Sequence, residues 1–461
     1  MLRERLIGAL GTDGVKTAPE DLSVYAFDAY TDGGRPLAVV LPRSTNEVSA
    51  VVKIAREFGE PIVARGAGTG LCGGAVPAAG GIVVSTMRMN RILELDVANR
   101  RARVQSGLMN LDLSRRVAAE GLFYAPDPSS QQISTIGGNI ATNAGGPHCL
   151  SYGTTVNHVL GLEVVDEAGE IFTTSIDGSG YDLTAALVGS EGTLGIVTSA
   201  WVRLLAVPEA VRVWVAAFEQ MEAACEAVSA IVAAGIVPTA LEMMDAVILK
   251  AVEAAFAAGY PTDAAAVLLV ESAGFEEDVD GAESSIAAIA KGHAARYWRS
   301  AHTPAERNAL WAGRKGAAGA TGRIAPNYYT QDVCVPRSKL PAALRAVEAA
   351  AAEHAIVVGN VFHAGDGNLH PLLMYDRRDR RQVAAVVETG NAILESAIEL
   401  GGTISGEHGI GWEKRDAMTR VYSTTDLATM GRVRDVFDPR RRLNPEKIFP
   451  SGARCAEVTP P

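Results

Sequence analysis

The glycine-rich segment 65–77, RGAGTGLCGGAVP, constrains the fold of the first half of the chain more than any other feature. It follows the short apolar run 61–64, and its glycine spacing from Gly68 satisfies the dinucleotide fingerprint GxGxxG. That fingerprint has meaning only where a helix begins at the loop. Here Pro77 and a second apolar run at 82–84 follow instead, so we expect a strand. The sequence therefore argues against a nicotinamide-dependent dehydrogenase of the doubly wound type.

A helix is predicted directly before this segment. Ser44 and Glu47 have the spacing of a capping box, apolar residues then recur at helical spacing, and Gly59 is placed to end the helix. A helix alternating with two short apolar runs indicates a region that contains both helices and strands.

Two further segments, 126–153 and 189–198, are rich in glycine and in hydroxyl or amide side chains. In the first of them, Ile136 and Ile140 recur at a spacing that predicts a short packed turn or helix, and the second ends in a strand. Loops of this kind can present successive backbone N–H groups to a pyrophosphate. Three such segments in one region predict that this part of the chain wraps around a large, extended cofactor.

The motif VFHAGDGNLHP near the carboxyl end predicts a hairpin. Turn-forming residues at 365–368 separate the apolar runs 356–362 and 369–374, which we expect to be two strands. A hairpin at this position brings His363 and His370 together.

The segment SGEHGIG supplies Glu407 and His408 between glycines that let the backbone bend. Together with His363 and His370, they form a set in which three side chains can hold a divalent cation and the fourth can move a proton. Imidazole and carboxylate are ligands that zinc accepts, and three protein ligands leave a position open for substrate. The alternative is that each histidine is an ordinary polar residue in a loop.

Composition and charge exclude several classes of partner. A chain of 461 residues with 48% hydrophobic content is long enough for two or three domains. Its net charge of -11 argues against nucleic acid, and no apolar stretch approaches the roughly 18 residues of a membrane span. The five cysteines are scattered and predict reduced thiols without an iron–sulfur cluster. We expect a cytoplasmic protein without an integral membrane segment, associated with the inner face of a membrane only through partners.

The glycine-rich segments resemble, in order and spacing, the FAD-binding half of vanillyl-alcohol-oxidase type flavoproteins. HAGDGNLHP, SGEHGIG and DPRRRLNPEKIF resemble that superfamily's D-2-hydroxyacid dehydrogenases, and are most similar to the FAD subunits of bacterial glycolate oxidases. The resemblance runs from about residue 42 to residue 455.

The resemblance implies an α+β fold with a two-lobed FAD-binding domain at 1–207, a substrate cap domain carrying the metal site at 208–411, and a carboxyl-terminal segment at 412–461 that packs back on the FAD domain. Alternating strand and helix patterns in the cap predict a mainly antiparallel sheet with helices on one face.

The resemblance also implies which residues contact FAD. The loop from Arg65 to Leu71 would hold the pyrophosphate, and Asn444 would return near the flavin ring. Covalent members of the superfamily often carry a histidine in the first loop, where this chain has Thr69 and Gly70, so we expect FAD to bind without a covalent link. The complete set of predicted FAD contacts is Arg65, Gly66, Ala67, Gly68, Thr69, Gly70, Leu71, Pro128, Ser129, Ser134, Gly137, Gly138, Asn139, Thr142, Asn143, Gly145, Glu191, Gly192, Gly195, Ile196 and Asn444.

For catalysis, the family pattern matches His363, His370 and Glu407 to ligands of a divalent metal, zinc or manganese, and His408 to the base. Arg314 would anchor the substrate carboxylate, and the alternative for it is an exposed arginine on a helix. The dicarboxylate-specific branch has a lysine where this chain reads Tyr-Tyr-Thr-Gln at 328–331, which favours a small substrate such as glycolate or D-lactate.

The predicted activity is therefore FAD-dependent, metal-assisted oxidation of a small 2-hydroxy acid, with hydride transfer to flavin N5. Electrons would pass to a partner protein or a quinone, and the chain would form a homodimer or join other oxidase subunits. The alternatives are a D-2-hydroxyglutarate or other D-2-hydroxyacid dehydrogenase, and a non-catalytic flavin-binding subunit of a larger complex.

Overall fold

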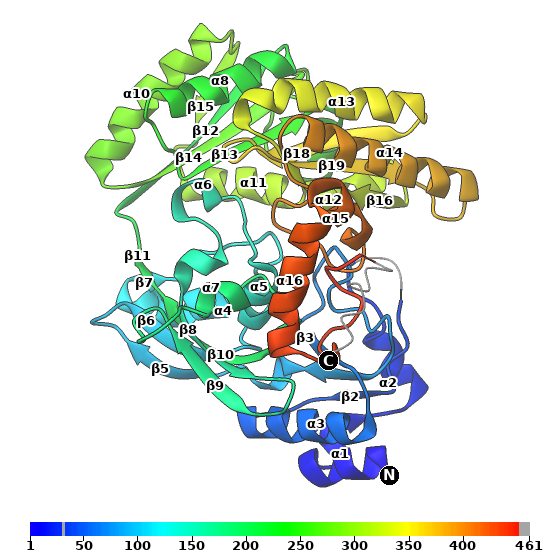
Figure 1. The fold of residues 1–461 in the computed structure, drawn as a ribbon. Coiled ribbons are helices and arrows are strands. Elements are labelled where there is room, and N and C mark those ends of the chain that lie inside the picture. Colours follow the sequence, from blue (N-terminus) through cyan, green and yellow to red (C-terminus); the bar gives the residue numbers. More distant parts are fainter. Residues whose placement is uncertain (30–32, 451–461) are drawn as a thin grey trace. The chain divides into compact units, whose positions relative to one another are not determined.

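A computed structural model describes residues 1–29 and 33–450 of the chain, which divide by their contacts into two units. Unit one comprises Met1–Gly145, Gly153–Val207 and the chain from Glu407 onward, whereas unit two comprises Gly146–Tyr152 and Pro208–Gly406 (Figure 1). The predicted domain boundaries at 207 and 411 stay a prediction.

Unit one contains two main sheets. The first has the strand order β1-β2-β4-β3, with β2 and β3 parallel to β4, and the second is antiparallel with the order β5-β6-β10-β8-β9. The strands are β1 (Val15–Lys16), β2 (Ala38–Val40), β3 (Ile62–Arg65), β4 (Ile82–Ser85), β5 (Ile92–Asp96), β6 (Arg101–Gln105), β8 (Val159–Val165), β9 (Ile171–Ser175) and β10 (Ile196–Arg203).

The helix predicted before the first glycine-rich segment is α3 (Thr45–Phe58). The hydroxyl of Ser44 accepts from the backbone N–H of Glu47 at 3.3 Å, and Gly59 ends the helix in the left-handed conformation at φ 78°. The Glu47 carboxylate accepts from the N–H of Arg43 at 2.7 Å, one residue earlier than in a standard capping box. The predicted start and end of this helix are thus confirmed.

The glycine-rich segments also have the predicted local structure. No helix stands between β3 and β4 in this described stretch, which confirms that the fingerprint does not open a helix. Ile136 and Ile140 are buried on α5 (Ile136–Thr142), where the Thr135 hydroxyl caps the helix by accepting from the N–H of Gly138. The third segment leads into β10.

Unit two is built around one large antiparallel sheet with the order β15-β12-β14-β13-β18-β19-β16, and β17 also pairs with β19. This confirms the predicted antiparallel sheet. Its strands are β12 (Ala210–Phe218), β13 (Ala240–Asp245), β14 (Ala266–Gly274), β15 (Tyr297–Ser300), β16 (Asn327–Thr330), β17 (Val333–Cys334), β18 (Val357–His363) and β19 (Asn368–Tyr375).

Helices cover both faces of this sheet, so the expectation of helices on one face was wrong (Figure 1). The reason is that central strands such as β13 are buried at every position, on both faces. One layer consists of α9 (Ala246–Phe256), α11 (Pro304–Lys315) and α12 (Ala317–Ala320), and the other of α8 (Met221–Ala233), α10 (Glu276–Gly292), α13 (Leu340–Glu353) and α14 (Arg380–Glu399).

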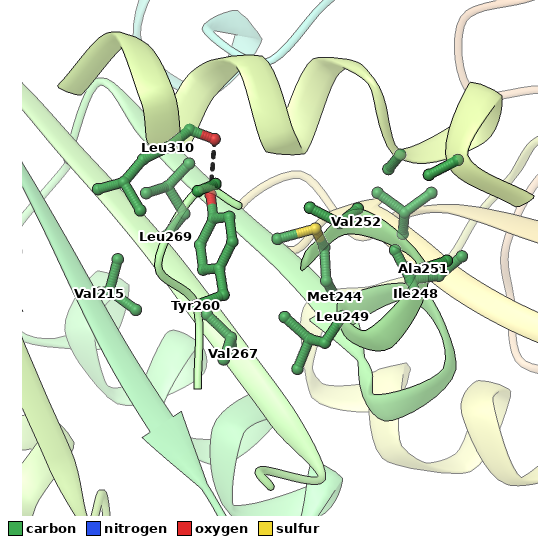
Figure 2. Close-up of a cluster of buried hydrophobic side chains, with 14 of the residues drawn as sticks. Val215, Met244, Ile248, Leu249, Ala251, Val252, Tyr260, Val267, Leu269 and Leu310 are labelled. Carbon is green, nitrogen blue, oxygen red and sulfur yellow. Dashed lines mark hydrogen bonds between the residues drawn. The ribbon is translucent and has the colours of Figure 1, made fainter. Parts of the chain in front are cut away.

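Figure 2 shows the apolar core under the first of these layers. Alternate residues of β12 and β14, such as Val215 and Leu269, belong to the same buried apolar cluster as Ile248 of α9. The buried hydroxyl of Tyr260 donates to the backbone carbonyl of Leu310 at 2.8 Å, so a polar group ties α11 to this core.

Two predictions from composition can be compared with the described residues. Within 1–29 and 33–450, no helix is both long and apolar enough to cross a membrane. None of the cysteines at 72, 149, 225 and 334 forms a disulfide within the described residues, whereas Cys455 lies outside them.

Candidate active site

The two predicted histidine ligands lie on the β18–β19 hairpin of unit two. In its register His363 pairs with Asn368 and His370 pairs with Val361, so the two histidines are diagonal neighbours on one face. Their ring centroids are 5.0 Å apart at 87°, and one ring nitrogen of each lies within 4.8 Å of the other. Both side chains are buried, His363 at 3% exposure and His370 at 9%. The hairpin therefore brings the pair together as predicted.

Each histidine also faces a buried carboxylate. The Nδ1 atom of His363 lies 2.7 Å from Glu242 Oε1, and the Nδ1 atom of His370 lies 3.6 Å from Asp332 Oδ1. A carboxylate at Nδ1 orients the ring and leaves the opposite nitrogen, Nε2, to serve as a metal ligand. This donor set fits a divalent cation.

Asp332 also holds the chain next to the predicted third ligand. Its Oδ2 atom accepts from the hydroxyl of Ser405 at 2.8 Å and from the backbone N–H of Gly406 at 2.9 Å. A Cβ at position 406 would lie only 2.1 Å from Asn368 Oδ1, so any other residue there would displace the Asn368 amide. Glu407 is the next residue in the chain.

The sequence did not identify Glu242, which also pairs with the predicted carboxylate anchor. Arg314 on α11 is 5% exposed, Glu242 is 1% exposed, and the guanidinium NH2 atom of Arg314 contacts Glu242 Oε2. The alternative of an exposed arginine is therefore wrong. A signal for Glu242 does exist, because it interrupts the apolar residues of β13 that precede Asp245 at the end of the strand, and a buried charge needs a partner.

Glu407 and His408 belong to unit one, at the start of its last chain segment. The Nε2 atom of His408 is 3.9 Å from Glu407 Oε1, and the backbone carbonyl of His408 accepts from the thiol of Cys72 at 2.9 Å. The predicted base is thus anchored through its main chain to the first glycine-rich segment.

The predicted FAD contacts all lie in unit one. They occupy the end of β3 and the loop after it, the residues before, within and just after α5, and the turn that leads into β10, and Asn444 lies in the last chain segment. Ser134 Oγ and Asn139 Nδ2 are buried and have no hydrogen-bond partner among the described residues. Buried polar atoms in native proteins are normally bonded. These two atoms therefore fit a site that receives the polar groups of a cofactor.

Several predicted FAD residues, among them Arg65, Asn444 and Glu191, have side chains bonded to the protein itself. The NH1 atom of Arg65 donates to the carbonyl of Phe27 at 2.6 Å, and burial lowers the pKa of Arg65. The Nδ2 atom of Asn444 donates to the carbonyls of Gly74 at 2.9 Å and Glu191 at 2.7 Å. Glu191 is buried, which raises its pKa to about 7. Its role toward the cofactor stays a prediction.

Comparisons with known proteins give two matching family models and several similar proteins. A model of the FAD binding domain matches residues 36–175, and a model of the FAD linked oxidases, C-terminal domain, matches 207–448. Glycolate oxidase subunit GlcD of Escherichia coli (strain K12) is 45% identical over 92% of this chain and 85% of that protein. D-lactate dehydrogenase of Anaerostipes hadrus is 35% identical over 90% of each chain. The structure of p-cresol methylhydroxylase with substrate bound shares the fold at a TM-score of 0.81 and 16% identity, covering 97% of this chain and 96% of that one.

Proposed function

The chain belongs to the family of FAD-linked oxidases, and within it we propose the oxidation of a small 2-hydroxy acid, glycolate or D-lactate, to the 2-oxo acid. Its α+β fold is that of the vanillyl-alcohol-oxidase type of flavoenzyme, with an FAD-binding domain and a second domain containing a large antiparallel sheet. The names of the two relatives support glycolate or D-lactate as the substrate.

The observation that carries this proposal is the pair of buried histidines, each with a carboxylate at Nδ1. We assign His363, His370 and Glu407 as ligands of the cation, and the predicted zinc or manganese identity and cytoplasmic location are parts of the same proposal. When bound, FAD supplies the two-electron acceptor, and a divalent cation lowers the pKa of the substrate's α-hydroxyl.

The side chains of the protein bind the substrate and move its proton. Arg314 keeps donors that Glu242 does not use, among them Nε, which has no hydrogen-bond partner in the described chain, and these anchor the substrate carboxylate. His408 takes the α-hydroxyl proton, because imidazole is the side chain that titrates closest to neutrality. The same oxidation also removes a hydride from the α-carbon, and FAD would be its acceptor.

A partner protein or a quinone would be the final acceptor of the two electrons. The relative from Escherichia coli is named as a subunit, which supports a role for this chain within a larger oxidase.

The test is anaerobic mixing of the purified flavoprotein with glycolate, D-lactate, L-lactate and D-2-hydroxyglutarate while flavin absorbance is followed. Glycolate or D-lactate should bleach the flavin without added NAD. The variant His408→Ala should retain flavin and lose bleaching. The control His354→Ala removes a histidine at the end of α13 and should bleach at the wild-type rate. Unchanged bleaching in His408→Ala would remove the assignment of the base.

A further inference from the structure

The segment 407–413, here called the His408 loop, is held in unit one by two side chains from the glycine-rich segments. Cys72 lies in the first segment; its thiol donates to the carbonyl of His408 at 2.9 Å, and its carbonyl accepts from the N–H of Trp412 at 2.8 Å. Glu191 lies in the third segment, and its two carboxylate oxygens accept from the N–H groups of Ile410 at 2.7 Å and Gly411 at 2.8 Å. The backbone of an irregular loop is thus bonded at successive residues.

The loop is also too closely packed for side chains at its glycines. Gly411 has φ +55°, and a Cβ there would lie 2.1 Å from the carbonyl oxygen of Cys72. Gly409 has φ +89°, and its Cβ would lie 2.8 Å from Glu191 Oε1. Cys72 and Glu191 therefore fix the backbone of the His408 loop, Cys72 at His408 and Trp412 and Glu191 at Ile410 and Gly411.

Burying a carboxylate to hold a loop costs desolvation free energy. Glu191 is 5% exposed, and replacement of buried charged groups by apolar ones is often neutral or stabilising. Lys447 supplies compensating charge near it, with its ammonium donating to the carbonyl of Val76 at 2.6 Å. A buried carboxyl group bonded to the main chain two and three residues after His408 therefore indicates a task other than stability.

We propose that Glu191 and Cys72 are positioning residues that hold the His408 loop, and with it the catalytic base, in the geometry needed for proton transfer. This inference rests on the proposed role of His408. Neither residue has to touch the substrate, because both act on the main chain that carries the imidazole.

The first experiment measures amide hydrogen exchange across residues 405–413 of the flavin-loaded protein. Glu191→Gln keeps the size of the side chain but replaces one acceptor oxygen by a donor, so exchange at Ile410 or Gly411 should accelerate about tenfold or more. Glu167→Gln is the matched control, since Glu167 is another buried glutamate of unit one, 3.9 Å from Arg440. Unchanged exchange in Glu191→Gln, or equal acceleration in Glu167→Gln, would overturn the proposal.

The second experiment separates positioning from folding. Cys72→Ala removes the donor to the His408 carbonyl, whereas Cys72→Ser keeps one. Flavin reduction by glycolate should slow about tenfold in Cys72→Ala and in Glu191→Gln, with substrate affinity changed less than about threefold, and Cys72→Ser should recover most of the rate. Equal rates in Cys72→Ala and Cys72→Ser would refute the role of the thiol.

The outcomes also distinguish this inference from the proposed function. If His408→Ala still bleaches, the proposed function fails, whatever the exchange data show. If His408→Ala is inactive but Glu191→Gln reduces flavin at the wild-type rate, the proposed function stands and the positioning role is refuted.

Discussion

Replacing Glu242 by glutamine should weaken metal binding and destabilise unit two at once. In the wild-type protein, Oε1 of Glu242 lies 2.7 Å from His363 Nδ1, and Oε2 contacts the guanidinium of Arg314. Glutamine keeps the shape but leaves a cation that is 5% exposed without its counter-charge, which costs about 3–5 kcal/mol. Loss of a carboxylate behind a metal-binding histidine lowers metal affinity about 10–100-fold.

The assay is competition for Zn²⁺ or Mn²⁺ between the metal-free protein and a fluorescent chelator. Stability is followed by urea unfolding, which Trp214, Trp298 and Trp311 report for unit two. The matched control is Glu271→Gln, which removes a buried carboxylate of the same sheet, bonded to Trp311 at 2.6 Å and His148 at 2.9 Å. This control should lose stability and keep its metal affinity within about threefold.

A double variant separates the two effects. Combining Glu242→Gln with Arg314→Met removes the uncompensated cation and should restore most of the lost stability, because an apolar side chain of similar size is well tolerated at such a site. Metal affinity should stay low, since His363 still lacks its carboxylate. Wild-type metal affinity in Glu242→Gln would refute the argument that this carboxylate orients the ligand.

Three further predictions follow from the site and the core. Treatment with a chelator should leave flavin absorbance intact but abolish bleaching by glycolate, and Zn²⁺ or Mn²⁺ should restore it. Burial raises the pKa of Glu191 from 4.5 to about 7, so the folded state holds a proton that the unfolded state lacks between these values, and this group lowers stability as pH rises. Calorimetry should therefore show the melting temperature of Glu191→Gln improving relative to wild type from pH 5 to pH 7. Tyr260→Phe should cost about 1 kcal/mol in urea unfolding, because the carbonyl of Leu310 loses its 2.8 Å donor.

Local features of this chain were predictable because short-range rules decide them. Turn formers between two apolar runs predicted the hairpin of His363 and His370, and isoleucines at helical spacing predicted α5. The absence of a helix after the first glycine-rich segment followed from Pro77 and the next apolar run.

Long-range partners were not predictable in the same way. Glu242 is 121 positions from His363, and Cys72 is 336 positions from His408. Periodicity shows that β13 is buried but not which strand lies beside it, so the partner of its carboxylate stays unknown until the sheet order is known. The second helical layer was missed for a related reason, since an all-apolar strand shows burial without showing what covers each face.

The buried carboxylates of this chain differ in their partners, and the kind of partner predicts whether a carboxylate holds the backbone or serves the metal site. Asp245 accepts from the N–H of Ile248 at 2.9 Å and from the N–H of Asn360 at 2.6 Å, so it holds main chain, as Glu191 does. Glu242 instead faces His363 and Arg314. Asp332 has both kinds of partner, since Oδ1 faces His370 and Oδ2 accepts from the N–H of Gly406.

Asp245 therefore provides the test of this distinction. Asp245→Asn turns one acceptor into a donor facing N–H groups, which should lower the urea midpoint of unit two, because buried donors are left unpaired. Metal affinity should change less than about threefold, since no imidazole loses its carboxylate. A loss of metal affinity as large as that of Glu242→Gln would show that the kind of partner does not separate the carboxylates that serve the metal from those that hold the backbone.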